Sequence, residues 1–153
     1  METKSLSVAV VDDHTLIRTV VCGFLEEHGF TVLLQAANGR TFLEQLEQCK
    51  TLPDVCLIDV HLPFMNGMEI ARRIKKQWPD MLILGFSTSD EPATIVKMLR
   101  SGASGFILKD NAYEEIKGAI MELYTKGYYF SDMVFKAVLE YLQKGSLHEQ
   151  ATN

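Results

Sequence analysis

Five short apolar runs recur along the chain, and each is followed by a segment with helical spacing. The runs cover residues 6–11, 31–36, 55–58, 81–86 and 104–108. In the segments that follow them, apolar residues recur at spacings of three and four, as in Ile116, Ala119, Ile120 and Leu123, which is typical of amphipathic helices. The pattern predicts five strand-helix units, (βα)5.

The predicted strands are apolar on successive residues rather than on alternate ones. Residues 8–11 and 82–84 contain no polar side chain, as is typical of parallel strands that are covered on both faces. Right-handed crossovers then place helices on both sides of the sheet. For five strands, the doubly wound order 2-1-3-4-5 leaves a crevice between strands one and three. We therefore predict a flavodoxin-like α/β fold with its chemistry at that crevice.

A further helix is predicted after residue 130. Ser131 is a suitable N-cap, and Val134, Val138 and Leu142 repeat at a spacing of four. We therefore divide the chain into a domain over residues 1–130 and a C-terminal helix or linker over residues 131–153. Two interpretations of this helix stay open: it packs on the domain, or its apolar face awaits a partner as a linker or dimerisation helix.

The composition indicates one globular domain. The 153 residues match a single domain of about 150 residues, and 47% hydrophobic with 23% charged residues is close to the globular average. Fifteen basic residues against 20 acidic ones give a formal charge of −5, which has the wrong sign for a surface that neutralises nucleic-acid phosphates. We expect contact with DNA only through a downstream domain that this chain does not contain.

No segment indicates a membrane span or an oxidising compartment. The longest apolar stretch, residues 81–86, is far shorter than the roughly 18 residues that cross a bilayer, and the N-terminus does not resemble a signal peptide. Cys22, Cys49 and Cys56 are odd in number and form no C-x-x-C pair. We expect a cytoplasmic protein with no membrane partner and with reduced thiols, of which Cys22 and Cys56 lie in the core.

Polar residues follow the predicted strands at their carboxyl ends: Asp12 and Asp13, Asp59, Ser87 and Lys109. Because these ends meet at one edge of a parallel sheet, the side chains are expected to share a pocket. Three carboxylates at close range raise one another's pKa unless a cation compensates them, and an all-oxygen ligand set selects Mg²⁺. An anion that bridges Mg²⁺, the Lys109 ammonium and the Ser87 hydroxyl is most naturally a phosphoryl group.

Asp59 is the candidate nucleophile, because a carboxylate can form an aspartyl phosphate. It stands alone on the central strand, whereas Asp12 and Asp13 are adjacent and better placed to hold a metal. Phosphoryl transfer depends mostly on positioning and charge neutralisation, so a separate general base is unnecessary.

These residues lie in segments that resemble the receiver domains of two-component response regulators. The resemblance covers about residues 6–130, and its subtype is similar to the NarL/LuxR class of transcriptional regulators. The segments that carry it are VVDDH (10–14), DVHLPFMNG (59–67), GFS (85–87) and GASGFILKD (102–110).

The resemblance implies a role for each site residue. Asp59 would accept phosphate from the phosphohistidine of a sensor histidine kinase, with at most weak self-phosphorylation and self-dephosphorylation and no other enzymatic activity. The implied Mg²⁺ ligands are Asp13 and Asp59 directly, Asp12 through water and His61 through its backbone carbonyl. Ser87 and Lys109 would hold the phosphoryl oxygens.

The resemblance further implies a switch in which Phe106, on strand five, follows the movement of Ser87. The output face would be helix four, strand five and helix five, which would control a transcription-regulating DNA-binding domain. A second copy of the chain, in a homodimer, is a further candidate partner, and the resemblance does not assign the face of that contact. Phe106 lacks the hydroxyl of the Tyr that is more frequent in the family, so its switching would work by packing. Asp110 stands where many receivers carry a proline.

Other functions are less well supported by the sequence. A haloacid dehalogenase-type hydrolase expects Asp-x-Asp, but position 14 is His; residues 85–89 lack the second Gly of a nucleophile elbow; and the chain has no P-loop. A stand-alone or phosphorylation-independent receiver-fold interaction module stays an alternative. For His14 we expect helix capping or solvent exposure rather than contact with phosphate.

Overall fold

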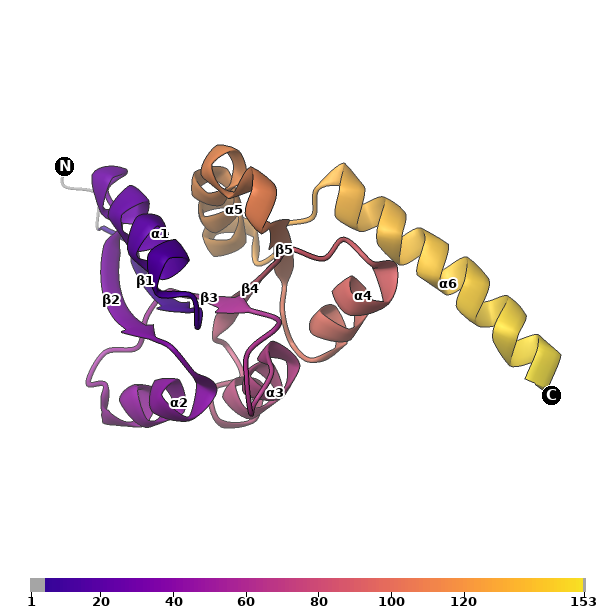
Figure 1. The fold of residues 1–153 in the computed structure, drawn as a ribbon, viewed down its shortest axis with the longest axis horizontal. Helices are drawn as coiled ribbons and strands as arrows, with labels where there is room; N and C mark the ends of the chain where they lie inside the picture. The colour runs from indigo at the N-terminus through magenta and orange to yellow at the C-terminus, as the bar shows by residue number, and fades with distance from the viewer. Residues whose placement is uncertain (1–4, 153) are drawn as a thin grey trace.

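The predicted flavodoxin-like fold is confirmed in a computed structural model, which describes residues 5–152. Five parallel strands lie in the order β2-β1-β3-β4-β5 (Figure 1). The elements are β1 (Ser7–Val11), α1 (Thr15–Glu27), β2 (Thr31–Ala36), α2 (Gly39–Gln48), β3 (Val55–Asp59), α3 (Gly67–Gln77), β4 (Leu82–Ser87), α4 (Pro92–Arg100), β5 (Gly105–Leu108), the 3₁₀ turn η1 (Lys109–Asn111), α5 (Ala112–Lys126) and α6 (Asp132–Thr152).

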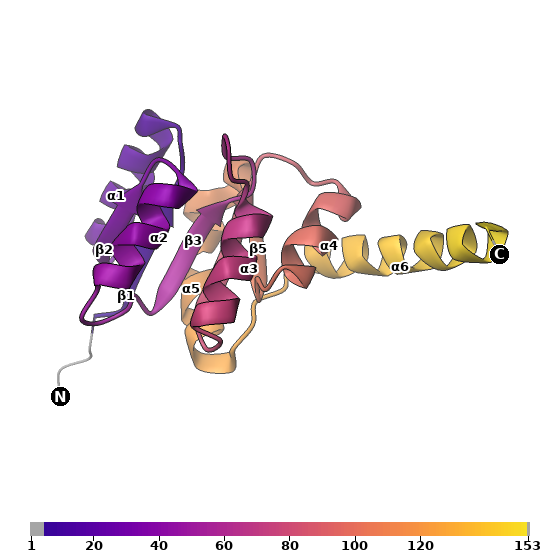
Figure 2. The same ribbon diagram turned by 90° about the horizontal axis from the view of Figure 1, so that it is seen from below.

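Two helical layers sandwich the sheet, with α1 and α5 on one face and α2, α3 and α4 on the other (Figures 1 and 2). The residues of β1 divide between two hydrophobic clusters: Val8 and Val10 pack in the α1/α5 cluster, while Ala9 and Val11 pack in the opposite one. All four are fully buried. Burial on both faces explains why this strand carries an unbroken apolar run.

The strands end level with one another at their carboxyl edge. Asp59 pairs with Phe86, and Ser87 pairs with Leu108. The strands β3 and β4 therefore extend one residue beyond the predicted runs, because the hydrogen-bonded ladder continues through the first polar residue. This register places Asp59 and Ser87 at the ends of neighbouring strands.

The start of α3 packs tightly against the end of β3. The amide of Gly67 donates a hydrogen bond to the Val60 carbonyl (2.9 Å), and the Asn66 side chain caps the helix by accepting from the Glu69 amide (3.0 Å). A Cβ at position 67 would lie 2.5 Å from the Asp59 carbonyl oxygen and 2.8 Å from Val60 Cα. Glycine is required here because two backbone segments approach too closely for a side chain.

The helix α6 packs on α4 through its first turns. Ser131 is the N-cap, as predicted: its Oγ accepts a hydrogen bond from the Val134 amide (3.3 Å). Val134 and Ala137 are buried in the same cluster as the α4 side chains. The rest of the helix extends past α4 (Figures 1 and 2). Among residues 132–145, whose side chains the structure describes, the large apolar side chains that α6 leaves exposed are Phe135, Leu139 and Leu142.

The connection between α5 and α6 lies along the free edge of β5, an arrangement that the sequence did not predict. The Tyr129 amide donates to the Ser104 carbonyl (2.9 Å), and Tyr129 forms a parallel bridge with Gly105. The Tyr129 hydroxyl donates to Glu115 (2.8 Å), and burial together with this carboxylate raises the pKa of Tyr129 to about 12. The connection is thereby tied to both β5 and α5.

The cysteines are unpaired, and Cys22 and Cys56 are buried as predicted. Burial raises the pKa of both thiols, as expected for core residues that do not act as thiolates. Among the helices in the described part of the chain, none combines the length and apolar character of a membrane span.

The contact at Gly67 gives a stability prediction. Gly67→Ala should lower the free energy of unfolding by about 1–3 kcal/mol, because the methyl group overlaps backbone atoms that cannot rotate away. The matched control is Gly118→Ala in α5, where a Cβ meets nothing within 4 Å and the expected change is a gain of about 0.5–1 kcal/mol. Urea unfolding measures both variants, and equal effects would contradict the close-contact argument.

Candidate functional site

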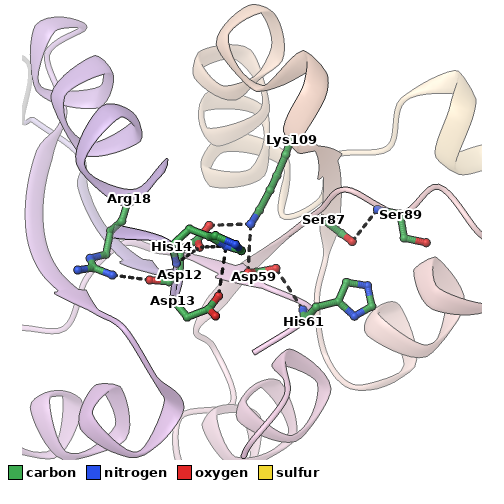
Figure 3. A network of polar contacts seen from close by, with 9 residues as sticks. All are labelled: Asp12, Asp13, His14, Arg18, Asp59, His61, Ser87, Ser89 and Lys109. Atoms are coloured by element: carbon green, nitrogen blue, oxygen red, sulfur yellow. Dashed lines mark hydrogen bonds and ion pairs between the residues drawn. The ribbon is translucent and has the colours of Figure 1, made fainter. Parts of the chain in front are cut away.

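The structure brings Asp12, Asp59 and Lys109 into direct contact at the carboxyl edge of the sheet (Figure 3). The Lys109 Nζ lies 2.8 Å from Asp12 Oδ2 and 3.1 Å from Asp59 Oδ2. The side chains of both aspartates are at most 3% exposed, and that of Lys109 is 8% exposed. One buried ammonium group therefore bridges carboxylates from β3 and from the end of β1.

The shared lysine does not fully compensate the two carboxylates. Burial raises the pKa of Asp59 above its ordinary value, against the opposing charge and hydrogen bond of Lys109, and the negative charge of Asp12 adds to the rise. Burial alone would lower the pKa of Lys109, but its hydrogen bonds to the aspartates and their charges outweigh burial and raise it. Lys109 is therefore held protonated, while Asp59 carries charge that its surroundings disfavour.

Asp13 completes an acidic cluster that fits a divalent cation. Ligand atoms of Asp12, Asp13, His14 and Asp59 all lie within 4.8 Å of one another. The Asp13 Oδ1 is buried and accepts no hydrogen bond from any described residue. Three ionised carboxylates and one ammonium leave two negative charges, which is the charge that a divalent ion neutralises. Oxygen ligands of this kind suit Mg²⁺.

Backbone amides fix the orientation of both buried aspartates. The His14 amide donates to Asp12 Oδ1 (2.9 Å), and the His61 amide donates to Asp59 Oδ1 (3.1 Å). The same turn, from residue i to i+2, thus follows β1 and β3. Arg18 adds a further contact, because its Nη1 donates to the Asp12 carbonyl oxygen (2.5 Å). Arg18 was not among the residues predicted for the site, and its only signal in the sequence is a basic residue one turn into the helix after Asp12.

Ser87 is buried at the end of β4 and lies across Asp59 from Asp12 (Figure 3). Its Oγ accepts a hydrogen bond from the Ser89 amide (3.0 Å). Phe106 is fully buried, and its Cδ2 lies 3.0 Å from where a Cβ at Gly85 would stand. The absence of a side chain at Gly85 gives the Phe106 ring its space next to β4.

The two histidines of the site differ in orientation. His14 is the N-cap residue of α1, and its side chain is 64% exposed and makes no capping hydrogen bond. The expected solvent exposure is confirmed. The His14 Nδ1 nevertheless lies 3.5 Å from both Asp12 Oδ1 and Asp13 Oδ1. His61 is exposed, and its ring points away from the carboxylates (Figure 3).

Comparison with known proteins identifies the family. The protein-family model of the response regulator receiver domain matches residues 8–121 of the chain. The chain belongs to the response regulator receiver domain family. Receiver domains are phosphoacceptors of two-component systems, and they bind Mg²⁺ at an acidic pocket.

Its relatives place this receiver domain near the NarL/LuxR type. A probable transcriptional regulatory protein NarL of Mycobacterium tuberculosis is 34% identical over 122 residues, which are 79% of this chain and 56% of that protein. The transcriptional regulatory protein DegU of Brevibacillus brevis is 30% identical over 132 residues, 86% of this chain and 55% of DegU. The chain thus spans little more than half the length of these relatives.

Solved structures agree with this assignment. A LuxR-family response regulator from Aurantimonas sp. superposes with a TM-score of 0.81 at 25% identity, over 90% of this chain and 97% of that one. The receiver domain of the putative response regulator NarL from M. tuberculosis superposes with a TM-score of 0.73 at 33% identity, over 80% of this chain and 98% of that one.

The raised pKa of Asp59 predicts a stabilising substitution. Ionising a carboxyl group whose pKa is higher in the folded state than in the unfolded state lowers the free energy of unfolding. The loss begins near the unfolded pKa, about 3.9, and is complete once the pH exceeds the folded pKa. In chelator-containing buffer at pH 7, Asp59→Asn should therefore be more stable than the wild type, and the difference should shrink as pH approaches about 4.

Urea unfolding at a series of pH values measures this difference. The control variant, Asp80→Asn, replaces an exposed aspartate and should follow the wild-type pH profile. An Asp59→Asn variant that is less stable than the wild type at pH 7 would show that the Lys109 ion pair outweighs the cost of burial.

Proposed function

We propose that this receiver domain takes a phosphoryl group from a sensor histidine kinase onto Asp59, with Mg²⁺ as cofactor. The observation that carries the proposal is the buried Asp59 carboxylate, which contacts Lys109 at 3.1 Å and lies within 4.8 Å of ligand atoms of Asp12 and Asp13. A carboxylate in this setting can attack phosphorus, and its surroundings supply compensating positive charge.

Each site residue would have its own role in the transfer of the phosphoryl group. A carboxylate oxygen of Asp59 forms the new bond to phosphorus, and the phosphorus-nitrogen bond breaks with its electrons leaving on the histidine of the kinase. Lys109 would neutralise charge on the transferred group. The metal ligands would be Asp13 and Asp59 directly, Asp12 through water and His61 through its backbone carbonyl. When bound, Mg²⁺ would neutralise the negative charge of the carboxylates and of a phosphoryl oxygen.

The switch would run from Ser87 to the face formed by α4, β5 and α5. To hold a phosphoryl oxygen, the Ser87 hydroxyl must turn toward Asp59 and change its present hydrogen bond with Ser89. That movement would alter the space next to Gly85 in which Phe106 is packed. Phosphorylation would then favour a second arrangement of the output face through better contacts there.

The relatives support a role in transcription control. NarL and DegU are named as transcriptional regulatory proteins, and we infer that residues 1–130 form a regulatory domain and that the segment after it, residues 131–153, leads to a DNA-binding domain outside this chain. A homodimer fits this role. The three unpaired cysteines suit a reducing compartment, so we place the protein in the cytoplasm.

Phosphorylation of Asp59 is the first test. Incubation with Mg²⁺ and acetyl phosphate should add the mass of one phosphoryl group in intact-protein mass spectrometry. Asp59→Asn should abolish the adduct, and Asp80→Asn, which alters an exposed aspartate, should leave it unchanged. An unmodified wild-type protein, or a full adduct on Asp59→Asn, would contradict the proposal and favour a phosphorylation-independent interaction module.

Lys109 provides a second test, because it joins the phosphorylation site to the start of α5. Lys109→Ala should still form some adduct but should lose the conformational response, measured as a change in amide hydrogen exchange of residues 92–108 on phosphorylation. The control is Asp110→Ala, the exposed neighbour in the same turn, which should keep the response. An unchanged response in Lys109→Ala would remove the lysine from the switch.

A further inference from the structure

An imidazole stands at the acidic cluster, although the implied Mg²⁺ site uses no histidine side chain. Nδ1 of His14 lies 3.5 Å from Asp12 Oδ1 and 3.5 Å from Asp13 Oδ1, and Figure 3 shows its ring beside these carboxylates. We propose that His14 is a metal-selecting residue: its side chain adds a nitrogen ligand and shifts the preference of the site from Mg²⁺ toward first-row transition-metal dications. The inference rests on the proposed metal site.

The geometry brings the four donors almost to binding distance. Metal-to-ligand bonds of about 2.0–2.2 Å allow donors on opposite sides of an ion to stand about 4.0–4.4 Å apart. The donor atoms of Asp12, Asp13, His14 and Asp59 lie within 4.8 Å of one another. Only small movements are needed for the donors of Asp13, His14 and Asp59 to reach one ion directly, with Asp12 held through water, and the exposed His14 side chain is free to make them.

In the described structure, the contacts of the His14 imidazole are long pairs with the carboxylates of Asp12 and Asp13, which are ionic only when the ring is protonated. Its distance of 3.5 Å from the carboxylate oxygens exceeds that of a normal N–H···O hydrogen bond. The backbone amide of His14, not the ring, makes the bond to Asp12 Oδ1. In the tautomer protonated on Nε2, the Nδ1 lone pair is available to a metal. The buried Asp13 Oδ1, which accepts no hydrogen bond from the described residues, faces the same space.

Ligand chemistry gives the direction of the selectivity. Mg²⁺ prefers oxygen ligands and keeps several waters, so it gains little from an imidazole. Ni²⁺ and Mn²⁺ accept nitrogen ligands, and affinity rises from Mn²⁺ to Ni²⁺ for a given site. His14 should therefore strengthen the binding of Ni²⁺ and Mn²⁺ while leaving that of Mg²⁺ nearly unchanged.

Metal titrations of the unphosphorylated chain test this proposal. Calorimetry gives the dissociation constants for Mg²⁺ and Ni²⁺ in the wild type, in His14→Ala and in His61→Ala. His61 is the matched control, because its ring points away from the carboxylates (Figure 3). We expect His14→Ala to weaken Ni²⁺ binding on the order of tenfold to a hundredfold, to change Mg²⁺ binding less than about threefold, and His61→Ala to change neither.

Pulsed electron paramagnetic resonance on the Mn²⁺-loaded protein gives an independent readout. Coupling to a directly bound ¹⁴N nucleus should appear in the wild type and in His61→Ala and disappear in His14→Ala. The proposal is overturned if the wild type shows no ¹⁴N coupling, or if His14→Ala weakens Ni²⁺ and Mg²⁺ equally. A wild type that binds Mg²⁺ normally but lacks ¹⁴N coupling refutes the role of His14 alone, whereas failure to bind any of the three ions refutes the metal site itself.

Discussion

The site depends on one constraint: buried carboxylates from two strands share a single ammonium group. Lys109 joins Asp12 and Asp59 at 2.8 and 3.1 Å, and removing these charges from water is costly unless they are paired. The fold meets this constraint by ending its parallel strands at one edge, where the backbone amides of His14 and His61 hold the carboxylates in place. The remaining negative charge makes the pocket receptive to a cation.

The sequence predicted the features that depend on periodicity and on strand ends. Unbroken apolar runs identified the buried parallel strands, and the parallel topology alone was enough to expect that Asp12, Asp59 and Lys109 meet. Contacts that depend on the direction of a side chain or on the path of a loop could not be predicted from the sequence. The hydrogen bond of Arg18 and the pairing of Tyr129 beside β5 depend on where a flexible side chain and an irregular connection lie, and the spacing of residue types alone does not fix either.

The proposed switch and the C-terminal helix share one hydrophobic cluster. Phe106, the α4 residues Ile95 and Met98, and Val134 of α6 are buried in it together. In a close-packed cluster, a side chain that moves displaces the side chains it touches. A new position of the Phe106 ring would therefore shift side chains of α4 and then of α6. The helix that would lead to an effector domain thus packs on the face that is expected to respond.

The connection between α5 and α6, which contains Tyr129, also covers part of the backbone of the edge strand β5. A bare edge strand presents free amide and carbonyl groups that can pair with a strand of another molecule. Tyr129 and the chain around it occupy part of that edge beside Ser104 and Gly105. The covered part of the edge offers fewer unpaired amide and carbonyl groups, which lowers the tendency of the sheet to add a strand from another molecule.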